Sequence, residues 1–421
     1  MRRYDNALGW LLAAALAVTV FAFAAGSSIQ YQVLFYARTY RWVCLFVLLG
    51  TALLSAAASW SWNRLPWGFL ALVAGLLALA FCSAAWSVDA SLTLRRAGSL
   101  AVVFAIAAAL LVAPARRVLI GLLTGAAAVG ITGLGMLALD HGAAVQAAST
   151  QYPARFQGFE QNPDTAALLF ALAIPITVYL LLTTRTGLAR VALTAAVLLF
   201  VGSITASGAR GPMLGGLVGS LVVVAAVAQG RRRLLLAALT LAAFAACVGI
   251  SRIPQAKPAP PTSSSGAPPV RRTLFTSSGR RAAWVGAIHQ AEDRPAAGYG
   301  FGTEALVFVD RYAAFDSDLV ENSYIGAALQ LGIAGLVLLL AVALAALGPF
   351  ARAPSRGARA ACAGTAAAAL VVAVTQSYLL SVGNIGTVTA WISLFLVAGQ
   401  PAAAASSAKI ASREIAGSHS G

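Results

Sequence analysis

The sequence contains few charged residues, and acidic ones are the rarest. Only 10% of its 421 residues are charged, and 13 Asp or Glu stand against 29 Lys or Arg. Soluble domains carry roughly 25% charged residues, so the composition excludes an ordinary water-soluble protein. Cysteine is scarce as well, and the four cysteines (Cys44, Cys82, Cys247 and Cys362) all fall in apolar segments. The sequence therefore predicts no disulfide framework and no metal-binding cysteine pair.

Apolar residues dominate instead, at 60% of the chain. A membrane-spanning helix needs roughly 20 consecutive apolar residues, and about twelve segments meet that criterion. They lie near residues 7–25, 42–62, 67–85, 97–113, 119–139, 165–183, 191–206, 212–229, 234–250, 324–348, 360–380 and 385–401. The segments are too long and alternate too little for the strands of a barrel. Only helices and closed barrels pair every backbone group in lipid, so we predict an all-α polytopic membrane protein with about twelve transmembrane helices.

Basic residues are distributed unequally between the two sides of the predicted membrane. With a cytoplasmic N-terminus, the inside segments hold Arg2, Arg3, Arg64, Arg116, Arg117, Arg185, Arg190, Arg231, Arg232, Arg233, Arg352, Arg356, Arg359, Lys409 and Arg413. The short outside loops hold Arg38, Arg41, Arg95, Arg96, Arg155 and Arg210. Because long loops are exempt from the positive-inside rule, this excess inside predicts cytoplasmic termini and one large periplasmic loop. The net charge of +16 is thus partly a signal of topology, and no nucleic-acid partner is expected.

This topology divides the chain into four regions. Residues 1–250 form a membrane domain with spans one to nine, and residues 251–323 form the large periplasmic loop between the ninth and tenth spans. Residues 324–401 hold spans ten to twelve, and residues 402–421 form a cytoplasmic tail that is expected to be disordered. No internal repeat is visible, which argues against a transporter built from two matching halves.

Two local patterns add detail to this division. An amphipathic helix is expected over residues 280–292, with Trp284, Ile288 and Ala291 on one face, which indicates a position at the membrane surface. Within the spans, several glycines are spaced for close packing between helices. They are Gly121, Gly125, Gly211, Gly215 and Gly219.

Arginines that face the outside are the first candidates for functional residues. Arg210 lies in a very short turn, SITASGARGPMLGG, where an arginine is costly unless something pairs with it. Arg155 lies in another outside loop, and Arg280 and Arg281 begin the amphipathic helix. These side chains could snorkel to the interface or pair with acids of the large loop. Alternatively they form an anion site, because guanidinium groups bind phosphate oxygens in a bidentate manner.

Acidic residues of the large loop are the second candidates. Glu321 precedes Asn322 at the start of the tenth span, where the helix dipole already favours a carboxylate. Partial burial there would raise its pKa and suit it to act as a base. Asp316 and Asp318 resemble a metal-binding DxD pair, although two acids in a solvated loop are common. The GYGFG run at 298–302 lacks the preceding strand of a dinucleotide fold, so its glycines are expected to form tight turns.

Four sequence blocks resemble the O-antigen ligase and polymerase superfamily, which includes exopolysaccharide polymerases. In chain order they are WSVDASLTLRR, GFEQNPDTAALLFALAIP, TASGARGPMLG, and GRRAAWVGAIHQAEDRPAAGYGFG followed by ENSYIGAALQLGIAG. Together they cover most of the chain from about Ser83 to Gly335. Each block is short, and the specificity lies in their order and in the large outside loop between late spans.

The resemblance implies a lipid-dependent, inverting glycosyltransferase in the bacterial inner membrane. Such enzymes take a glycan from undecaprenyl diphosphate at the periplasmic face, and no nucleotide, metal or other cofactor is expected. Ligases transfer the glycan to lipid A–core, and polymerases transfer it to another carrier-linked glycan. The leaving group is then a diphosphate, and fixed guanidinium groups are natural stabilisers of the charge that grows on it. Donor, acceptor and membrane lipids are therefore the expected partners.

The resemblance also implies roles for individual residues. Arg210 and Arg280 would clamp the diphosphate, with Arg281 or Arg155 as further contacts. Asn162, in the loop before the sixth span, would shape the site with Arg155. Family members commonly carry His-Asn before an aromatic residue at the entrance of the tenth span, and the roles implied there fall on Glu321, Asn322 and Tyr324. Glutamate can accept the acceptor's proton, but unlike histidine it cannot become a cation that binds phosphate.

Several functions therefore remain open on sequence grounds. A ligase-like transferase with Glu321, Arg210 and Arg280 as catalytic residues is the preferred hypothesis, and a polymerase is the first alternative. A transporter of a lipid-linked or small anionic substrate would also line a membrane cavity with arginines. A non-catalytic component of an envelope assembly complex is the last alternative.

Overall fold

The computed structural model describes residues 2–25, 31–59, 65–147, 154–159, 162–250, 280–308 and 319–399. Of the described residues, 82% are helical. Within the described ranges, ten helices are long and apolar enough to cross a membrane. The predicted class, an all-α polytopic membrane protein, is confirmed.

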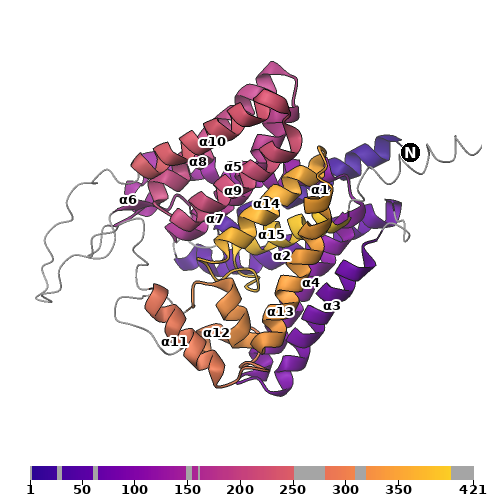
Figure 1. Ribbon diagram of the computed structural model, residues 1–421, viewed down its shortest axis with the longest axis vertical. Helices are drawn as coiled ribbons and strands as arrows, with labels where there is room; N and C mark the ends of the chain where they lie inside the picture. The colour runs from indigo at the N-terminus through magenta and orange to yellow at the C-terminus, as the bar shows by residue number, and fades with distance from the viewer. Residues whose placement is uncertain are drawn as a thin grey trace, which may run out of the picture.

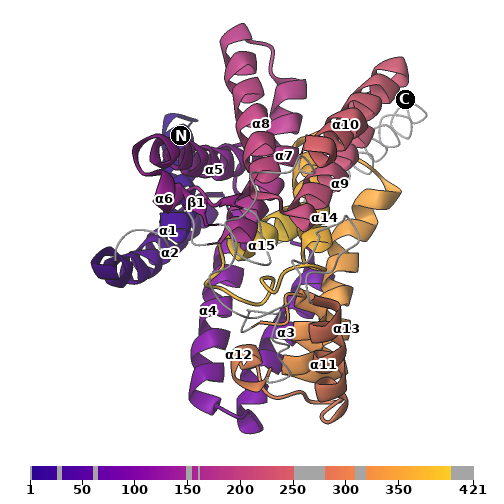
Figure 2. The same ribbon diagram turned by 90° about the vertical axis from the view of Figure 1, so that its left-hand side faces the viewer.

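The helices pack side by side in a bundle, with α14 and α15 near its centre (Figures 1 and 2). They are α1 (Arg2–Ala25), α2 (Tyr31–Ser59), α3 (Trp67–Cys82), α4 (Ala90–Ala109), α5 (Ala115–Leu139), α6 (His141–Ala144), α7 (Pro163–Thr183), α8 (Gly187–Ser207), α9 (Arg210–Val227), α10 (Gly230–Ile250), α11 (Arg280–Glu292), α12 (Glu304–Val307), α13 (Ser323–Arg352), α14 (Ala358–Val372) and α15 (Ile385–Gly399). A short antiparallel pair joins β1 (Val145–Gln146) to β2 (Arg155–Phe156).

Each of the twelve predicted spans overlaps one of these helices, but two are shorter than expected. Helices α14 and α15 have 15 residues each, which gives roughly 22 Å against a hydrocarbon core of about 30 Å. The prediction of a helix over residues 360–380 is wrong at its end, because α14 stops at Val372. Residues 373–384 form a non-helical connection, which we call the central loop. Such backbone is tolerated at membrane depth only when protein covers it, and Tyr378 and Leu379 are indeed fully buried.

The predicted close-packing glycines are confirmed where helices cross. A methyl group added at Gly219 of α9 would lie 2.5 Å from the carbonyl oxygen of Gly364 in α14. A methyl group at Gly121 of α5 would lie 2.6 Å from the carbonyl oxygen of Ala13 in α1. Small residues thus let these backbones approach closely, which is the main route to tight helix packing in a membrane.

Helix α13, the predicted tenth span, is broken at Gly332. This glycine has φ 65°, a left-handed conformation that interrupts the helix after its first nine residues. The loop before α12 lies across the break, because Ile333 N donates to Pro295 O at 2.8 Å and Gly300 N donates to Gln330 O at 2.9 Å. A side chain at position 332 would collide with the backbone of Ala296. The first segment of α13 is therefore set apart from the longer apolar segment that follows.

The GYGFG run forms tight turns, as expected from the sequence. Gly298, Gly300 and Gly302 all have positive φ, at 64°, 105° and 77°. The run packs on the connection between α3 and α4, where Phe301 N donates to Ser83 Oγ at 2.9 Å and Thr93 Oγ1 donates to Phe301 O at 2.8 Å. Two of the four sequence blocks that carry the family resemblance are therefore in direct contact.

Helix α11 has the predicted bounds, and its buried side differs in detail from the predicted face. Ala283 and Ala287 are fully buried against a small cluster that includes Phe308, Val320 and Leu329. Trp284 and Ala291 flank this cluster, as their predicted shared face requires. Ile288 does not join it, and 46% of its surface is exposed. Helix α11 thus packs against the first segment of α13 (Figure 2).

Candidate functional site

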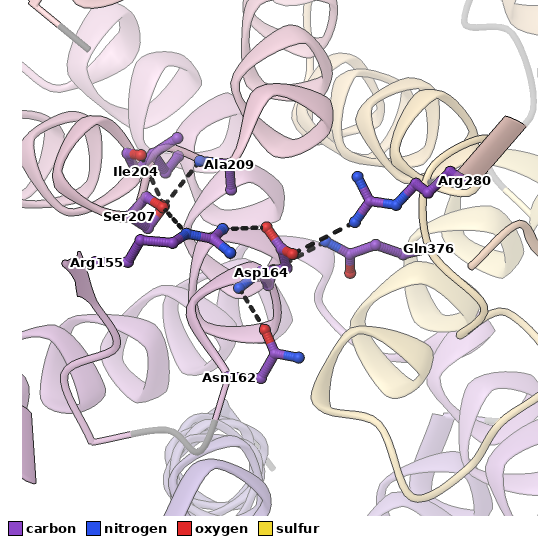
Figure 3. A network of polar contacts seen from close by, with 8 residues as sticks. All are labelled: Arg155, Asn162, Asp164, Ile204, Ser207, Ala209, Arg280 and Gln376. Carbon is purple, nitrogen blue, oxygen red and sulfur yellow. Dashed lines mark hydrogen bonds and ion pairs between the residues drawn. The ribbon is translucent and has the colours of Figure 1, made fainter. Parts of the chain in front are cut away.

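The centre of the candidate site is the carboxylate of Asp164, which lies between two arginines (Figure 3). Arg155 Nη2 lies 2.5 Å from Asp164 Oδ1, and Arg280 Nη2 lies 3.4 Å from Asp164 Oδ2. The three residues come from β2, the first turn of α7 and the first turn of α11. One carboxylate thus faces two guanidinium groups, and this trio carries a net positive charge.

The N-terminus of α7 fixes the position of Asp164. Asn162 is the N-cap, and its side-chain oxygen accepts from Asp164 N at 2.8 Å. Pro163 occupies the first helical position, where its missing N–H is harmless and its fixed φ suits the helix. The sequence Asn-Pro-Asp therefore begins the helix and aims the acid, and the helix dipole favours a negative charge at this end.

Arg155 is held on both sides of its guanidinium group. Besides the contact with Asp164, its Nε donates to the carbonyl oxygen of Ser207 at 2.6 Å, at the end of α8. Only 6% of Arg155 is exposed, and a charge so buried needs its partners. Arg280 differs, because 26% of its side chain is exposed and its contact with Asp164 is longer. Arg155 is therefore held firmly by the protein itself, and Arg280 is the more accessible of the two arginines that contact Asp164.

The central loop joins Asp164 to the start of α13. Gln376 Nε2 donates to Asp164 O at 2.9 Å, as Figure 3 shows. Ser323 Oγ donates to Gln376 O at 2.7 Å, and Asn322 N donates to Ser377 Oγ at 3.1 Å. A continuous path of hydrogen bonds therefore runs from the two arginines to the N-terminus of α13.

A buried glutamate, Glu304 of α12, anchors the other end of this path. Its Oε1 accepts from Ser377 Oγ at 2.7 Å and from Val320 N at 2.8 Å, and its Oε2 accepts from Gln330 Nε2 at 3.0 Å. Burial raises the pKa of the Glu304 carboxyl, while these three hydrogen bonds and the charge of Arg96 oppose the rise. The two residues that flank Glu321 are thus bonded to the Glu304–Ser377 pair: Val320 to Glu304 and Asn322 to Ser377.

Glu321 itself has an unusual backbone. Its φ is 57°, in the left-handed region that disfavours side chains. Such strain persists only where the surroundings determine it, and it is common at functional sites. Helix α11 also reaches this turn, because Trp284 Nε1 donates to Val320 O at 3.1 Å. Trp284 lies one turn after Arg280, so α11 carries both a site arginine and a contact next to Glu321.

The remaining predicted residues have defined places around this path. Arg210 is the first residue of α9, three positions after the Ser207 carbonyl that binds Arg155. Asn322 is the buried N-cap of α13, and its side chain accepts from the backbone of Tyr324 and Ile325. The Tyr324 hydroxyl donates to Leu370 O at 2.8 Å and ties α13 to α14. Arg281 is exposed.

Four residues of the site escaped the sequence reasoning. Asp164 lay in a quoted block without being singled out, Glu304 lay two residues after the end of another, and Gln376 and Ser377 lay in a predicted span. The only local signal for Asp164 is its place behind the Asn-Pro start of α7. Asp316 and Asp318, the predicted DxD pair, lie outside the described residues.

Residues 195–340 match a family model described as O-antigen ligase. The match begins within α8 and ends within α13, so it includes Arg210, Arg280 and Glu321. The resemblance to the O-antigen ligase and polymerase superfamily is thereby confirmed. This family is enzymatic, and it implies lipid-linked glycan substrates in a membrane. No curated protein matches the chain.

Proposed function

We propose, with the O-antigen ligase match over residues 195–340 as the premise, that this multi-pass membrane protein is a ligase-like glycosyltransferase. It would move a glycan from undecaprenyl diphosphate to a sugar hydroxyl of lipid A–core at the periplasmic face of the inner membrane. The observation that carries the proposal is the convergence of Arg155 and Arg280 on Asp164, beside the turn that begins α9 at Arg210.

The donor's diphosphate is the group that these arginines would bind. Arg210 and Arg280 would clamp it, and Arg281 would add a weaker contact from the exposed side of α11. Asp164 holds Arg280 by a single long contact. A diphosphate carries more negative charge than one carboxylate, so it can recruit Arg280 while Asp164 keeps Arg155 in place. Fixed guanidinium groups would then stabilise the charge that develops as the sugar departs.

The reaction would be a single displacement at the anomeric carbon. The acceptor oxygen forms a bond to that carbon as the bond from the carbon to the diphosphate oxygen breaks. The electron pair of the broken bond stays on the diphosphate, and the acceptor's proton passes to the Glu321 carboxylate. Asn322 and Tyr324 would support the pocket by fixing the start of α13. No nucleotide or metal enters this scheme.

An apolar hollow is suited to the donor's prenyl tail. It has a volume of about 280 Å³ and lies between α7, α8, α9 and α10. Ile204, Thr205 and Met213 line it, which places part of its wall within three residues of Ser207 and Arg210. A diphosphate at Arg210 would thus have its tail beside the hollow, in contact with lipid-facing helices.

A transfer assay with purified protein tests the proposal. Carrier-linked glycan and lipid A–core are supplied without added metal, and product is followed for the wild type, Arg210→Ala and Arg231→Ala. Arg231 is an exposed arginine at the start of α10 and serves as the matched control. We expect transfer by the wild type and the control and a loss of about 100-fold in Arg210→Ala. Full activity in Arg210→Ala would remove its proposed role.

The superfamily that this match supports also includes polymerases, which differ in the acceptor. The glycans of a strain that lacks this protein distinguish a ligase from a polymerase. Free core together with accumulated carrier-linked polymer indicates a ligase. Core that carries a single repeat, or lost exopolysaccharide, indicates a polymerase.

A further inference from the structure

A cationic cavity lies farther along the central loop. It has a volume of about 290 Å³ and is lined by Arg41 of α2, Arg96 and Ser99 of α4, and residues 380–383 of the loop. The guanidinium of Arg41 also lies over the ring of Phe23, 5.6 Å from its centroid. Both arginines belong to the outside set that opposes the positive-inside trend, and the donor site uses neither of them.

Arg96 is the more informative of the two arginines. Its side chain packs on Gly302, and its charge acts on the buried carboxyl of Glu304. Across the described parts of the chain, no hydrogen bond or ion pair engages its guanidinium group. A half-buried arginine in a membrane protein is costly unless it meets an anion, and the Glu304 oxygens already accept hydrogen bonds from Val320, Gln330 and Ser377. The loop residues in this cavity also lead directly into the N-terminus of α15, where the helix dipole favours an anion.

The same loop connects the cavity to the donor site. Gln376 contacts Asp164, and residues 380–383 line the cavity. Between them lies a small hollow of about 20 Å³, lined by Arg96, Glu304 and Ser377, which has room for about one water molecule. A ligand bound at Arg96 would therefore lie close to Ser377. Ser377 in turn contacts Asn322, the residue next to Glu321.

We propose that this cavity binds a phosphate group of the acceptor lipid. The inference rests on the proposed transferase function and deepens it. Both acceptors considered above, lipid A–core and a carrier-linked glycan, bear phosphate groups. The volume is ample for a phosphate, and two guanidinium groups from separate helices match its charge and can each donate hydrogen bonds to its oxygens. The acceptor would then be anchored at Arg41 and Arg96 while the donor is held at Arg210 and Arg280.

Binding measured in an Arg280→Gln background tests this inference, because the donor site is disabled there. Native mass spectrometry of the purified full-length protein follows undecaprenyl diphosphate and lipid A, each against its dephosphorylated form, with inorganic pyrophosphate as a third probe. Arg41→Gln and Arg96→Gln are compared with Arg95→Gln, an exposed neighbour on the same helix. Arg96→Lys keeps the charge and, with thermal unfolding, controls for folding.

We expect at least one lipid to bind in a phosphate-dependent manner. Arg96→Gln or Arg41→Gln should weaken that binding about tenfold, because each removes one charge-assisted hydrogen bond. Arg95→Gln should bind like its parent, and Arg96→Lys should retain part of the affinity. Binding that ignores Arg41 and Arg96 would overturn the inference. Pyrophosphate that binds as tightly as both lipids would overturn the assignment to the acceptor. If transfer is absent but Arg96-dependent lipid binding persists, the transferase function and the acceptor assignment fail together, while a phosphate site remains.

Discussion

The guanidinium of Arg280 lies 3.4 Å from the carboxylate of Asp164, although 116 residues separate them in the chain. The contact joins the first turn of α11, within the large loop, to the first turn of α7 (Figure 3). Asp164 also holds the buried Arg155. We therefore propose that this acid fixes Arg155 in place, while Arg280 can turn from Asp164 to the diphosphate.

Removal of the shared acid should damage both stability and activity. Asp164→Ala leaves the buried Arg155 without its closest partner, and loss of one member of a buried ion pair costs about 3 kcal/mol or more. We expect a lower unfolding free energy and little transfer. Asp164→Asn keeps the shape and one acceptor, so its unfolding free energy and activity should lie between those of the wild type and Asp164→Ala. Asp140→Ala, at an exposed N-cap on the same side of the bundle, is the control. Wild-type stability in Asp164→Ala would contradict the role of Asp164.

The buried carboxyl of Glu304 should make stability depend on pH. Burial raises its pKa above the ordinary value of 4.5, so the folded protein binds this proton more tightly than the unfolded chain. Its contribution to stability is therefore full below the ordinary pKa and is lost as pH rises through the raised pKa. Glu304→Gln should lack that decline. Thermal unfolding of both proteins across a pH series checks this, and a difference that grows more favourable to the wild type with pH would contradict it.

The break in α13 should require glycine at position 332. Gly332→Ala places a methyl group in a left-handed conformation and against the backbone of Ala296, which should lower the unfolding free energy by about 2 kcal/mol or more. Gly98→Ala is the control, because nothing lies within 4 Å of the added methyl in the helix α4. There alanine should stabilise by up to about 1 kcal/mol. Equal effects of the two substitutions on the unfolding free energy would contradict the requirement for glycine at position 332.

The proposed base should affect turnover more than binding. Glu321→Gln keeps the size of the side chain and removes its basicity, so kcat should fall by about 100-fold or more while the donor KM changes little. Glu292→Gln, at an exposed acid of α11, serves as control. A variant with normal kcat would show that another group takes the proton.

The fold was largely predictable because its signals are local. Each of the twelve apolar runs overlaps a helix, and the periodicity of residues 280–292 gave the bounds of α11. The central loop was not predictable, because its residues continue the apolar run of α14 and only tertiary burial satisfies their backbone. The pairing of Asp164 with Arg280 leaves no local pattern either. Glu304 looked like the end of a glycine-rich turn, and only packing against Gln330 and Ser377 reveals it as a buried acid.

The donor kcat/KM of Arg280→Ala, measured beside that of Arg281→Ala, tests the central claim most directly. The two arginines are adjacent and carry the same charge, but only Arg280 points to Asp164, while Arg281 is exposed. We expect a loss of about 100-fold to 1,000-fold for Arg280→Ala, as for removal of one transition-state donor, and less than about tenfold for Arg281→Ala. Near-normal transfer by Arg280→Ala, or equal losses in the two variants, would contradict it.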